Sequence, residues 1–317
     1  MWSGNHSSAV SNEMFMTHMG TDSDIAEKTF SFYLTGLTGQ SYIDFGTPNS
    51  AVMNGSVTYI DINSENYWWA ADLTGFRFSG ESEYAITTGS YSLTDTGSSC
   101  IIGPAEEADR ILKLIVTRLP KVYENDGWGY IFECPANYSD LPMFEFLYGG
   151  YWMEVHPDDY IIDVSANGTW CSVCISSVAG FNEWILGDAF MRGWYNIHDH
   201  DNWRMGFVPF VGSSKSAPET ATSTPSATIP DITLVNVGTL IFGLDSVTFY
   251  ILLAVFLLAA GCCTFCAVYL FMGGFAMSAT SRGKSILEKT AKKSTLLLGA
   301  SRAVQDEDSQ ISLIVLE

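Results

Sequence analysis

The stretch YSLTDTGSSCIIGP, residues 91–104, holds an Asp-Thr-Gly-Ser run between apolar residues. Two isoleucines, a glycine and a proline come after the run, so a polar turn leads into an apolar segment. An aspartate shortly before a glycine is typical of a turn, and a three-residue match is common by chance. Whether Asp95 is a turn residue or a carboxylate with a chemical role depends on the segments around it.

The segments on both sides of this run predict an all-β domain. FSFYLTG at 30–36 and GSVTYIDI at 55–62 are short runs rich in β-branched and aromatic residues, which favour strands. YWWAADLTGFRFSG at 67–80 predicts two strands around a Thr-Gly turn. One helix is expected over residues 104–116, because a proline and two glutamates suit its first turn.

A second long motif, WILGDAFMRGWYNIHDHDNWRMGFVPF, occupies residues 184–210. Together with FSFYL at 30–34 and DTGSSCIIGP at 95–104, it gives three blocks in a fixed order. The same blocks in the same order are found in the C-terminal lobe of pepsin-like aspartic endopeptidases, which this chain resembles over residues 30–210. The resemblance implies a single all-β lobe, with domain bounds at residues 30–211, and hydrolysis of peptide bonds at acidic pH.

The resemblance also implies a role for individual residues of the two motifs. Asp95 corresponds to a catalytic aspartate, and Gly97 to the glycine that allows the tight turn. Ser98 is expected to hydrogen-bond the outer oxygen of Asp95, and Thr96 to reach towards the other lobe. The strand that braces the catalytic loop corresponds to Ile185, Leu186 and Gly187, although core packing alone would also account for these three.

One aspartate is insufficient for this chemistry. Two carboxylates held close together share one proton, so that one serves as base and the other as acid, and this family is the reference case for such a pair. The sequence has no second Asp-Thr-Gly or Asp-Ser-Gly and nothing similar to the family's flap hairpin. We therefore expect an N-terminal lobe or, less simply, a second copy of the chain to supply the partner, with residues 1–29 as a remnant of the interlobe region.

A catalytically inactive, protease-like membrane protein is the alternative reading of the same residues. It would keep the ancestral lobe as a binding module without a complete dyad. The two readings differ in whether the mature molecule contains a second lobe that bears an aspartate.

Four cysteines precede residue 246, an even number that suits disulfides in an oxidising compartment: Cys100, Cys134, Cys171 and Cys174. Four cysteines allow three connectivities, and the residues alone do not choose among them. The resemblance implies a bond between Cys134 and Cys174, which would leave Cys100 and Cys171 to pair. WCSVC at 170–174 is similar to a thioredoxin redox motif, but no βαβ pattern surrounds it.

No metal or cofactor is expected. HDHD at 198–201 offers metal-ligand residue types, but four adjacent residues do not wrap one ion without help, so a solvated turn is favoured. The net charge of −20 argues against nucleic acid, which requires a basic surface. Such an acidic protein would lose self-repulsion as the pH falls.

The C-terminal part of the chain predicts a membrane anchor. Residues 212–245 are expected to form a stalk and juxtamembrane segment, since Ser213–Pro230 is rich in Ser, Thr, Pro and Ala. Residues 246–277 are uncharged and are expected to contain a transmembrane helix, because Phe249–Met272 alone would span roughly 36 Å as a helix. Residues 278–317 form the predicted cytoplasmic tail.

The expected orientation is that of a single-pass type I membrane protein. Six Lys and Arg residues and one Glu occupy residues 282–302, which places this end in the cytoplasm. All four N-glycosylation sequons precede the predicted helix, at Asn5, Asn54, Asn137 and Asn167. The lobe is therefore expected in the lumen of the lysosome, vacuole or secretory pathway, or at the cell surface. Residues 1–15 lack a signal-peptide pattern, so either the transmembrane helix directs insertion or a natural N-terminus precedes Met1.

Overall fold

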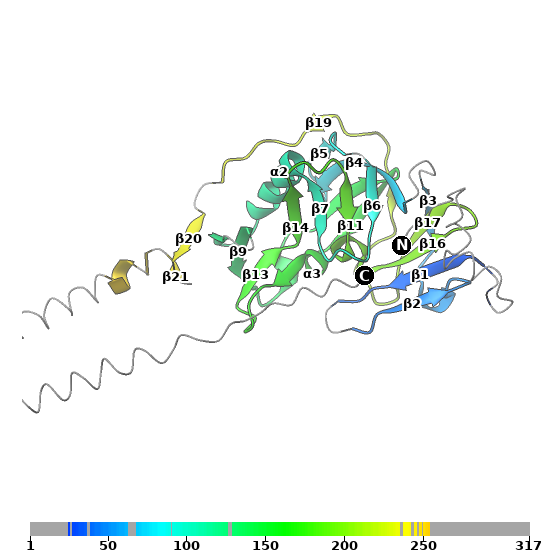
Figure 1. Cartoon of the computed structure of the whole chain (residues 1–317), viewed down its shortest axis with the longest axis horizontal. Coiled ribbons are helices and arrows are strands. Elements are labelled where there is room, and N and C mark those ends of the chain that lie inside the picture. The colour runs from blue at the N-terminus through cyan, green and yellow to red at the C-terminus, as the bar shows by residue number, and fades with distance from the viewer. Residues whose placement is uncertain are drawn as a thin grey trace, which may run out of the picture. The chain divides into compact units, whose positions relative to one another are not determined.

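The computed structural model describes residues 25–253, except residues 26, 37–38, 63–67, 90, 126–128, 235–236, 242–243, 246 and 249 (Figure 1). The chain divides into two compact units, Met1–Gly243 and Leu244–Glu317. In the second unit the described residues form β21 (Leu244–Asp245) and a short helical stretch at 247–248 and 250–253. Most of the predicted transmembrane segment thus lies outside the described residues, and within them no helix is long and apolar enough to cross a membrane.

The first unit is built mainly from strands in three sheets, which confirms the predicted all-β class. The first sheet is antiparallel, in the order β2 (Tyr42–Phe45), β1 (Thr29–Tyr33), β16 (Trp194–Asp199), β17 (Arg204–Pro209), β3 (Thr58–Asp61). The largest sheet has the order β14 (Ile175–Val178), β7 (Ile101–Pro104), β15 (Trp184–Leu186), β6 (Tyr91–Thr94), β4 (Ala70–Phe78), β10 (Phe144–Tyr148), β11 (Tyr151–Val155), β18 (Glu219–Thr220).

Two more strands extend the largest sheet: β5 (Glu83–Ala85) pairs with β4, and β19 (Ala227–Thr228) pairs with β5. The strands of the third sheet that belong to the first unit are β12 (Ile161–Asp163), β13 (Trp170–Val173), β9 (Gly129–Glu133), β8 (Val122–Asn125) and β20 (Gly238–Ile241). The helices are short apart from one: η2 (Ser50–Val52), α2 (Ala105–Val116), η4 (Tyr138–Asp140), α3 (Pro157–Tyr160) and α4 (Asp188–Met191).

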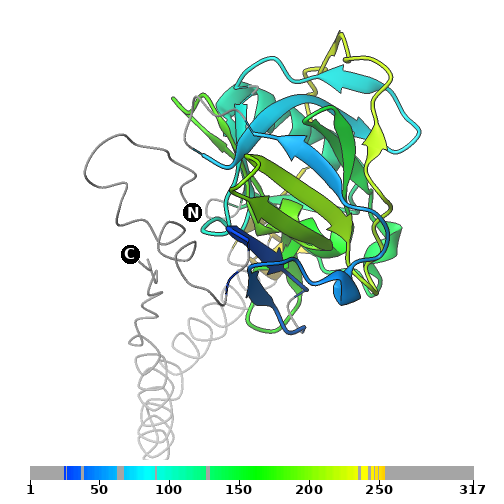
Figure 2. The same cartoon turned by 90° about the vertical axis from the view of Figure 1, so that its right-hand side faces the viewer.

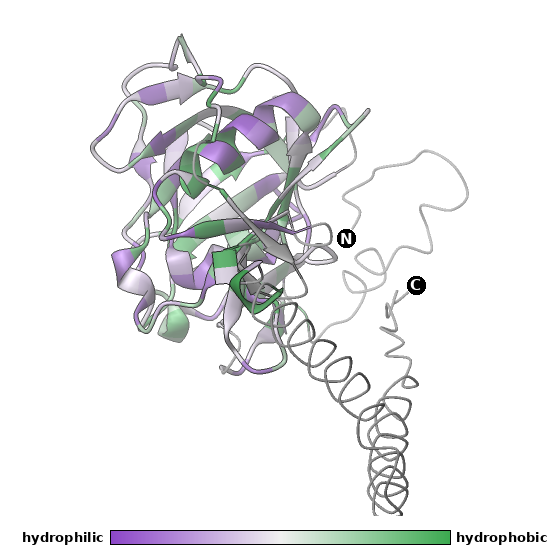
Figure 3. Ribbon diagram, turned by 90° about the vertical axis from the view of Figure 1, so that its left-hand side faces the viewer, coloured by the Kyte–Doolittle hydropathy of each residue, from purple (hydrophilic) through white to green (hydrophobic). Residues whose placement is uncertain are grey.

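Helix α2 lies where the sequence predicts a helix. It begins at Ala105, with Pro104 as the residue before its first turn, and two glutamates occupy that turn. Hydrophobic and hydrophilic residues alternate along it (Figure 3), and Ile111, Leu114 and Ile115 are buried against the core that it shares with β7 and β14. An apolar stripe at this spacing is what one buried helix face requires.

The prediction of two strands within residues 67–80 is wrong. A single strand, β4, runs from Ala70 to Phe78 through the expected turn. Gly75 lies in mid-strand, where an added Cβ would come within 2.9 Å of Pro225 and 3.0 Å of Trp152. A glycine in a strand can mark a close approach of another part of the chain as well as a turn, and here it marks close packing.

Residues 213–230 differ from the extended stalk that their composition predicts. Figures 1 and 2 show the yellow segment around residues 220–230 running along the outside of the domain. Its strand β18 pairs with β11, and β19 pairs with β5. Lys215 and Ile229 within it are only 5% and 4% exposed. We call residues 212–234 the strap. From Lys215 to Ile229 it is packed on the lobe at several points.

Candidate active site

Asp95 lies in the turn that follows strand β6. The sheet brings β15 between β6 and β7, parallel to β6 and antiparallel to β7. The backbone N–H of Asp95 donates to the carbonyl of Leu186 at 3.2 Å, which continues the β6–β15 ladder into the turn. The N–H of Ser98 then closes the turn on the carbonyl of Asp95 at 3.2 Å. The aspartate therefore projects from the end of a paired strand, and not from a free loop.

Two groups of the same turn hold the carboxylate of Asp95. The N–H of Gly97 donates to Oδ1 at 3.0 Å, and the hydroxyl of Ser98 donates to Oδ2 at 3.1 Å. Asp95 is half-buried. One donor on each oxygen fixes the plane of the carboxylate and leaves further lone pairs of both oxygens free to accept from another partner.

Two of the three residues that the resemblance assigns to a bracing strand, Leu186 and Gly187, contact this turn. Leu186 lies opposite Thr94 of β6 and Ile101 of β7, so the strand touches both arms of the loop. Ile185 is its neighbour in the same ladders. An added Cβ on Gly187 would lie 2.2 Å from the carbonyl oxygen of Ser98, a contact that leaves no room for any other residue type.

The first two residues of helix α4 also hold the loop. The N–H of Asp188 donates to the carbonyl of Ser98 at 2.8 Å, and the N–H of Ala189 donates to that of Ser99 at 3.0 Å. Burial raises the pKa of Asp188, the nearby charge of Asp95 raises it further, and Arg192 opposes both. Asp188 was not assigned a role from the sequence, although it stands directly after the bracing residues in the second motif.

Thr96 is half-buried at the tip of the turn. Among the described residues it makes no side-chain hydrogen bond. Its neighbour Thr94, in contrast, donates to the backbone carbonyl of Trp69 at 3.1 Å and lies 3.2 Å from the sulfur of Met205. Within the described part of the chain no second carboxylate shares a hydrogen bond with Asp95, so these residues do not contain a closed dyad.

The histidines and aspartates at 198–201 do not gather around one point. His198 is buried in β16 and stacks on Phe30 with 4.6 Å between ring centroids, and burial lowers its pKa to about 3. Asp199 is also buried and accepts hydrogen bonds from Asn202 and Arg204. The first half of the motif is therefore packed in the sheet, which differs from the expected solvated turn. Within the described ranges no group of three His, Cys, Asp or Glu residues could hold a metal ion.

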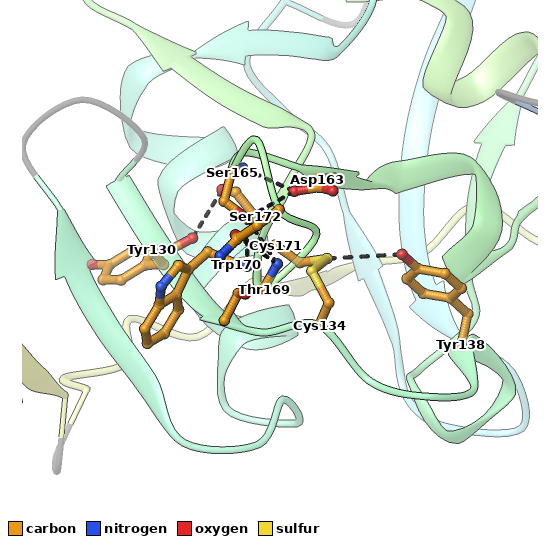
Figure 4. Close-up of a disulfide and its surroundings, with 10 residues drawn as sticks. Tyr130, Cys134, Tyr138, Asp163, Ser165, Thr169, Trp170, Cys171 and Ser172 are labelled. Carbon is orange, nitrogen blue, oxygen red and sulfur yellow. Dashed lines mark hydrogen bonds between the residues drawn. A yellow bond between two sulfur atoms is a disulfide. The ribbon is translucent and has the colours of Figure 1, made fainter. Parts of the chain in front are cut away.

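Among the described cysteines there are two disulfides, Cys100–Cys174 and Cys134–Cys171. The pairing of Cys134 with Cys174 that the resemblance implied is wrong. Strand β13 is antiparallel to β9, which brings Cys171 beside the end of β9, where Cys134 follows (Figure 4). Cys174 lies past the end of β13, and its carbonyl accepts from the N–H of Ile101 at 3.0 Å, next to Cys100.

These bonds contradict a redox pair made of Cys171 and Cys174. Each of the two is bonded to a different distant cysteine, and both are buried. In Figure 4 the hydroxyl of Tyr138 lies beside the sulfur of Cys171, at 3.8 Å. Both bonds therefore cross-link distant parts of the fold and stabilise it.

Three of the four sequons lie on the described surface. Asn54, Asn137 and Asn167 are all exposed, and Asn5 lies outside the described residues. The side chain of Asn137 accepts from the N–H of Ser139 at 3.1 Å, and that of Asn167 accepts from the N–H of Thr169 at 3.3 Å. Local turns thus present these side chains to solvent.

Comparison with known proteins places the site in a family context. The family described as eukaryotic aspartyl protease matches residues 3–210. Cathepsin D of Mus musculus is 30% identical over 199 residues, covering 59% of this chain and 46% of that protein. Pepsin-2B of Gadus morhua is 30% identical over 197 residues (61% and 57%), and gastricsin of Oryctolagus cuniculus is 29% identical over 197 residues (60% and 48%). The chain spans about half the length of these curated relatives.

Proposed function

Since this chain belongs to the eukaryotic aspartyl protease family, we propose that it supplies one aspartate, Asp95, to an aspartic endopeptidase. The observation that carries the proposal is the pair of hydrogen bonds from Gly97 and Ser98 to the two oxygens of Asp95. They hold the carboxylate at the end of β6 in one orientation. General acid–base catalysis requires such a positioned group.

The proposed reaction is hydrolysis of a peptide bond by a water molecule. In this scheme Asp95 and a second carboxylate share one proton: the ionised member takes a proton from the attacking water, and the protonated member polarises the substrate carbonyl. Ser98 and Gly97 keep Asp95 in plane, and Leu186 and Gly187 fix the loop. The substrate is an extended peptide or protein, and no cofactor takes part.

The second carboxylate is proposed to come from an N-terminal lobe or from a second copy of this chain. Two facts support this: within the described residues no second carboxylate shares a hydrogen bond with Asp95, and the chain spans about half the length of its relatives. Thr96, at the tip of the loop, is proposed to face that partner. A catalytically inactive, protease-like membrane protein remains the second candidate, and the same absence of a carboxylate partner favours it.

The proposed setting is an oxidising compartment on the non-cytoplasmic side of a membrane. Two disulfides support such a compartment, because disulfides persist there. Residues 246–277 are proposed to anchor the chain as a single-pass type I protein, on the strength of their uncharged sequence. Glycans are proposed on the exposed Asn54, Asn137 and Asn167, and also on Asn5.

Peptide cleavage by the full chain at acidic pH, measured as a function of its concentration, tests these proposals. If a second copy supplies the partner, the rate per chain rises with concentration, and excess Asp95→Asn chain suppresses it. If an N-terminal lobe does so, activity belongs to a native species whose deglycosylated mass exceeds 34.8 kDa by about one lobe. If neither the chain alone nor a larger native species cleaves peptides, the catalytic proposal is overturned and the inactive protein is left.

A further inference from the structure

Lys215 is a buried cation that neither the fold class nor the proposed chemistry explains. It belongs to the strap, beyond residue 210 where the match to the protease family ends. Its side chain is 1% exposed, although a lysine is rarely buried unless it is paired. A Ser- and Thr-rich segment that served only as a spacer would have no reason to bury a charge.

The surroundings of Lys215 are shaped to receive it. Its Nζ lies 3.1 Å from Oδ2 of Asp159 and donates to the carbonyl of Phe190 at 3.3 Å. It also lies 5.0 Å from the ring centroid of Trp194. Gly193 leaves the space for the aliphatic stem, since an added Cβ there would come within 2.6 Å of the lysine Cε. Burial lowers the pKa of Lys215, and Asp159 opposes that shift.

Phe190 connects this anchor to the candidate catalytic loop. It belongs to α4, a single four-residue turn, and the first two residues of that turn hold the loop through their amides. Asp188 donates to the carbonyl of Ser98 at 2.8 Å, and Ala189 donates to that of Ser99 at 3.0 Å. Because α4 is a single turn, Phe190 directly follows Asp188 and Ala189. A contact that fixes Phe190 therefore also restrains the amides of these two residues.

A second route joins the same groups. Nη1 of Arg192 donates to the backbone carbonyl of Asp159 at 3.0 Å, and Nη2 lies 3.9 Å from Oδ2 of Asp188. Arg192 therefore links Asp159, the partner of Lys215, to Asp188, whose amide holds the loop. The strap, α3 and α4 thus meet at one buried ion pair.

We propose that Lys215 is a positioning residue for Asp95, so that this one side chain of the strap supports the active site. Lys215 locks α4 through Phe190 and Asp159, and α4 holds the carbonyls of Ser98 and Ser99. The inference rests on the proposed function for its catalytic meaning, because Asp95 matters only if the protein hydrolyses peptides. Its structural content is testable without activity.

Amide hydrogen exchange on the full chain tests this link. Lys215→Met keeps an unbranched, mainly apolar stem that is one atom shorter, and it removes the charge. We expect the amides of Asp188 and Ala189 to exchange at least tenfold faster, while the amide of Phe146 in β10 keeps its wild-type rate. Unchanged exchange at Asp188 and Ala189, or an equal acceleration at all three amides, would overturn the proposal.

Two further variants keep the test decisive. Lys215→Met/Asp159→Asn removes both charges, so it avoids an unpaired buried carboxylate and should still loosen the amides of α4. Glu219→Gln is the matched control within the strap, because Glu219 pairs with Arg77 on β4 at 2.6 Å and, among the described residues, makes no ion pair with α4. It should leave the exchange of Asp188 and Ala189 unchanged, and faster exchange there would count against a specific role of Lys215.

Kinetics separate this proposal from the proposed function. In the active species Lys215→Met is expected to lower kcat at least fivefold and leave KM within twofold, whereas Glu219→Gln alters neither. Faster exchange with an unchanged kcat would overturn the catalytic role of the lysine. A wild-type protein without activity would overturn the proposed function, and the exchange result would still decide the structural link.

Discussion

The hydroxyl of Ser98 donates a hydrogen bond to Oδ2 of Asp95 at 3.1 Å, from three residues further along the same turn. The other oxygen of that carboxylate accepts from the amide of Gly97. Side chain and backbone of one tight turn therefore fix both oxygens before any substrate binds. The orientation of the candidate catalytic group is a local property of residues 95–98, and the strands β6 and β15 set the position of the whole turn.

Replacing Ser98 with alanine should remove one of the two hydrogen bonds that orient the carboxylate of Asp95. A hydrogen bond to a charged group contributes about 1.5–3 kcal/mol, so we expect the kcat of the active species to fall by roughly tenfold or more. Ser99→Ala is the matched control, since only the backbone carbonyl of Ser99 holds the loop. Equal peptide-cleavage rates for the two variants would show that the Ser98 hydroxyl has no role in orienting Asp95.

Gly187→Ala should disturb the loop through its backbone. The new Cβ would lie 2.2 Å from the Ser98 carbonyl oxygen and 2.5 Å from that of Cys100, and backbone atoms held in ladders have little room to move. We expect a loss of about 3 kcal/mol in the free energy of unfolding, at the upper end for overpacking. Gly36→Ala, where an added Cβ meets nothing within 4 Å, is the control. Similar urea-unfolding midpoints for the two variants would contradict the contact.

Disulfide mapping should find Cys100 linked to Cys174 and Cys134 linked to Cys171. The measurement is mass spectrometry of peptides digested without reduction. A peptide joining Cys134 to Cys174 would contradict the structure.

The double variant Cys100→Ala/Cys174→Ala should lower the free energy of unfolding, measured by urea denaturation, by about 4 kcal/mol. The reason is that the bond closes a separation of 74 residues in the unfolded chain.

Asp188 should make the stability of the lobe depend on pH. Its pKa is raised in the folded state, first by burial, so the folded protein binds its proton more tightly than the unfolded chain does. Ionised Asp188 therefore lowers the free energy of unfolding. This loss is absent below about pH 3.9, the ordinary pKa of Asp, and it grows as the pH rises towards the folded pKa. Asp188→Asn should therefore be more stable than wild type at pH 7, and the difference should vanish near pH 3.

Chemical denaturation of both proteins at the two pH values measures this difference. Asp140→Asn, an exposed position in η4, is the control and should show no such trend. A destabilising effect of Asp188→Asn that is equal at pH 3 and pH 7 would mean that the carboxylate is not the source of the pH dependence.

The two motifs contain the backbone partners that close the turn of Asp95, so the surroundings of this turn could be predicted from them. Residues 91–104 and 184–210 supply β6, β7 and β15, and the turn of Asp95 is closed by partners within these segments. Gly97 and Ser98 hydrogen-bond the carboxylate of Asp95, and Leu186 and Gly187 contact its turn, while the catalytic roles of these residues stay predictions. Their adjacency came from a family resemblance, since periodicity alone does not reveal that β15 runs between β6 and β7.

The disulfides could not be predicted from cysteine positions. Cys171 and Cys174 are three residues apart, yet β13 ends between them, so they face different neighbours. Which cysteine lies near Cys134 depends on the antiparallel register of β9 and β13, and this register is set by contacts distant in the sequence. The presence of disulfides could be predicted from the even number of these cysteines, and their connectivity could not.

The strap escaped prediction for a different reason. Its composition is polar and rich in Ser, Thr and Pro, and average composition is what identifies a spacer. Its buried residues are only three, Lys215, Pro225 and Ile229, too few and too widely spaced to show a strand or helix pattern. A buried lysine also runs against the usual preference of that residue, so only its partners Asp159 and Phe190 reveal its place.

The most direct test of the account is peptide cleavage at about pH 4 by the native active species, compared with its Asp95→Asn variant. The substitution keeps the size of the side chain and removes the carboxylate, and Asp140→Asn serves as the control. The account predicts that Asp95→Asn lowers kcat by at least about 10²-fold, the lower end of what one acid–base group contributes, while the control keeps the wild-type rate. An Asp95→Asn protein that cleaves peptides at the wild-type rate would contradict it.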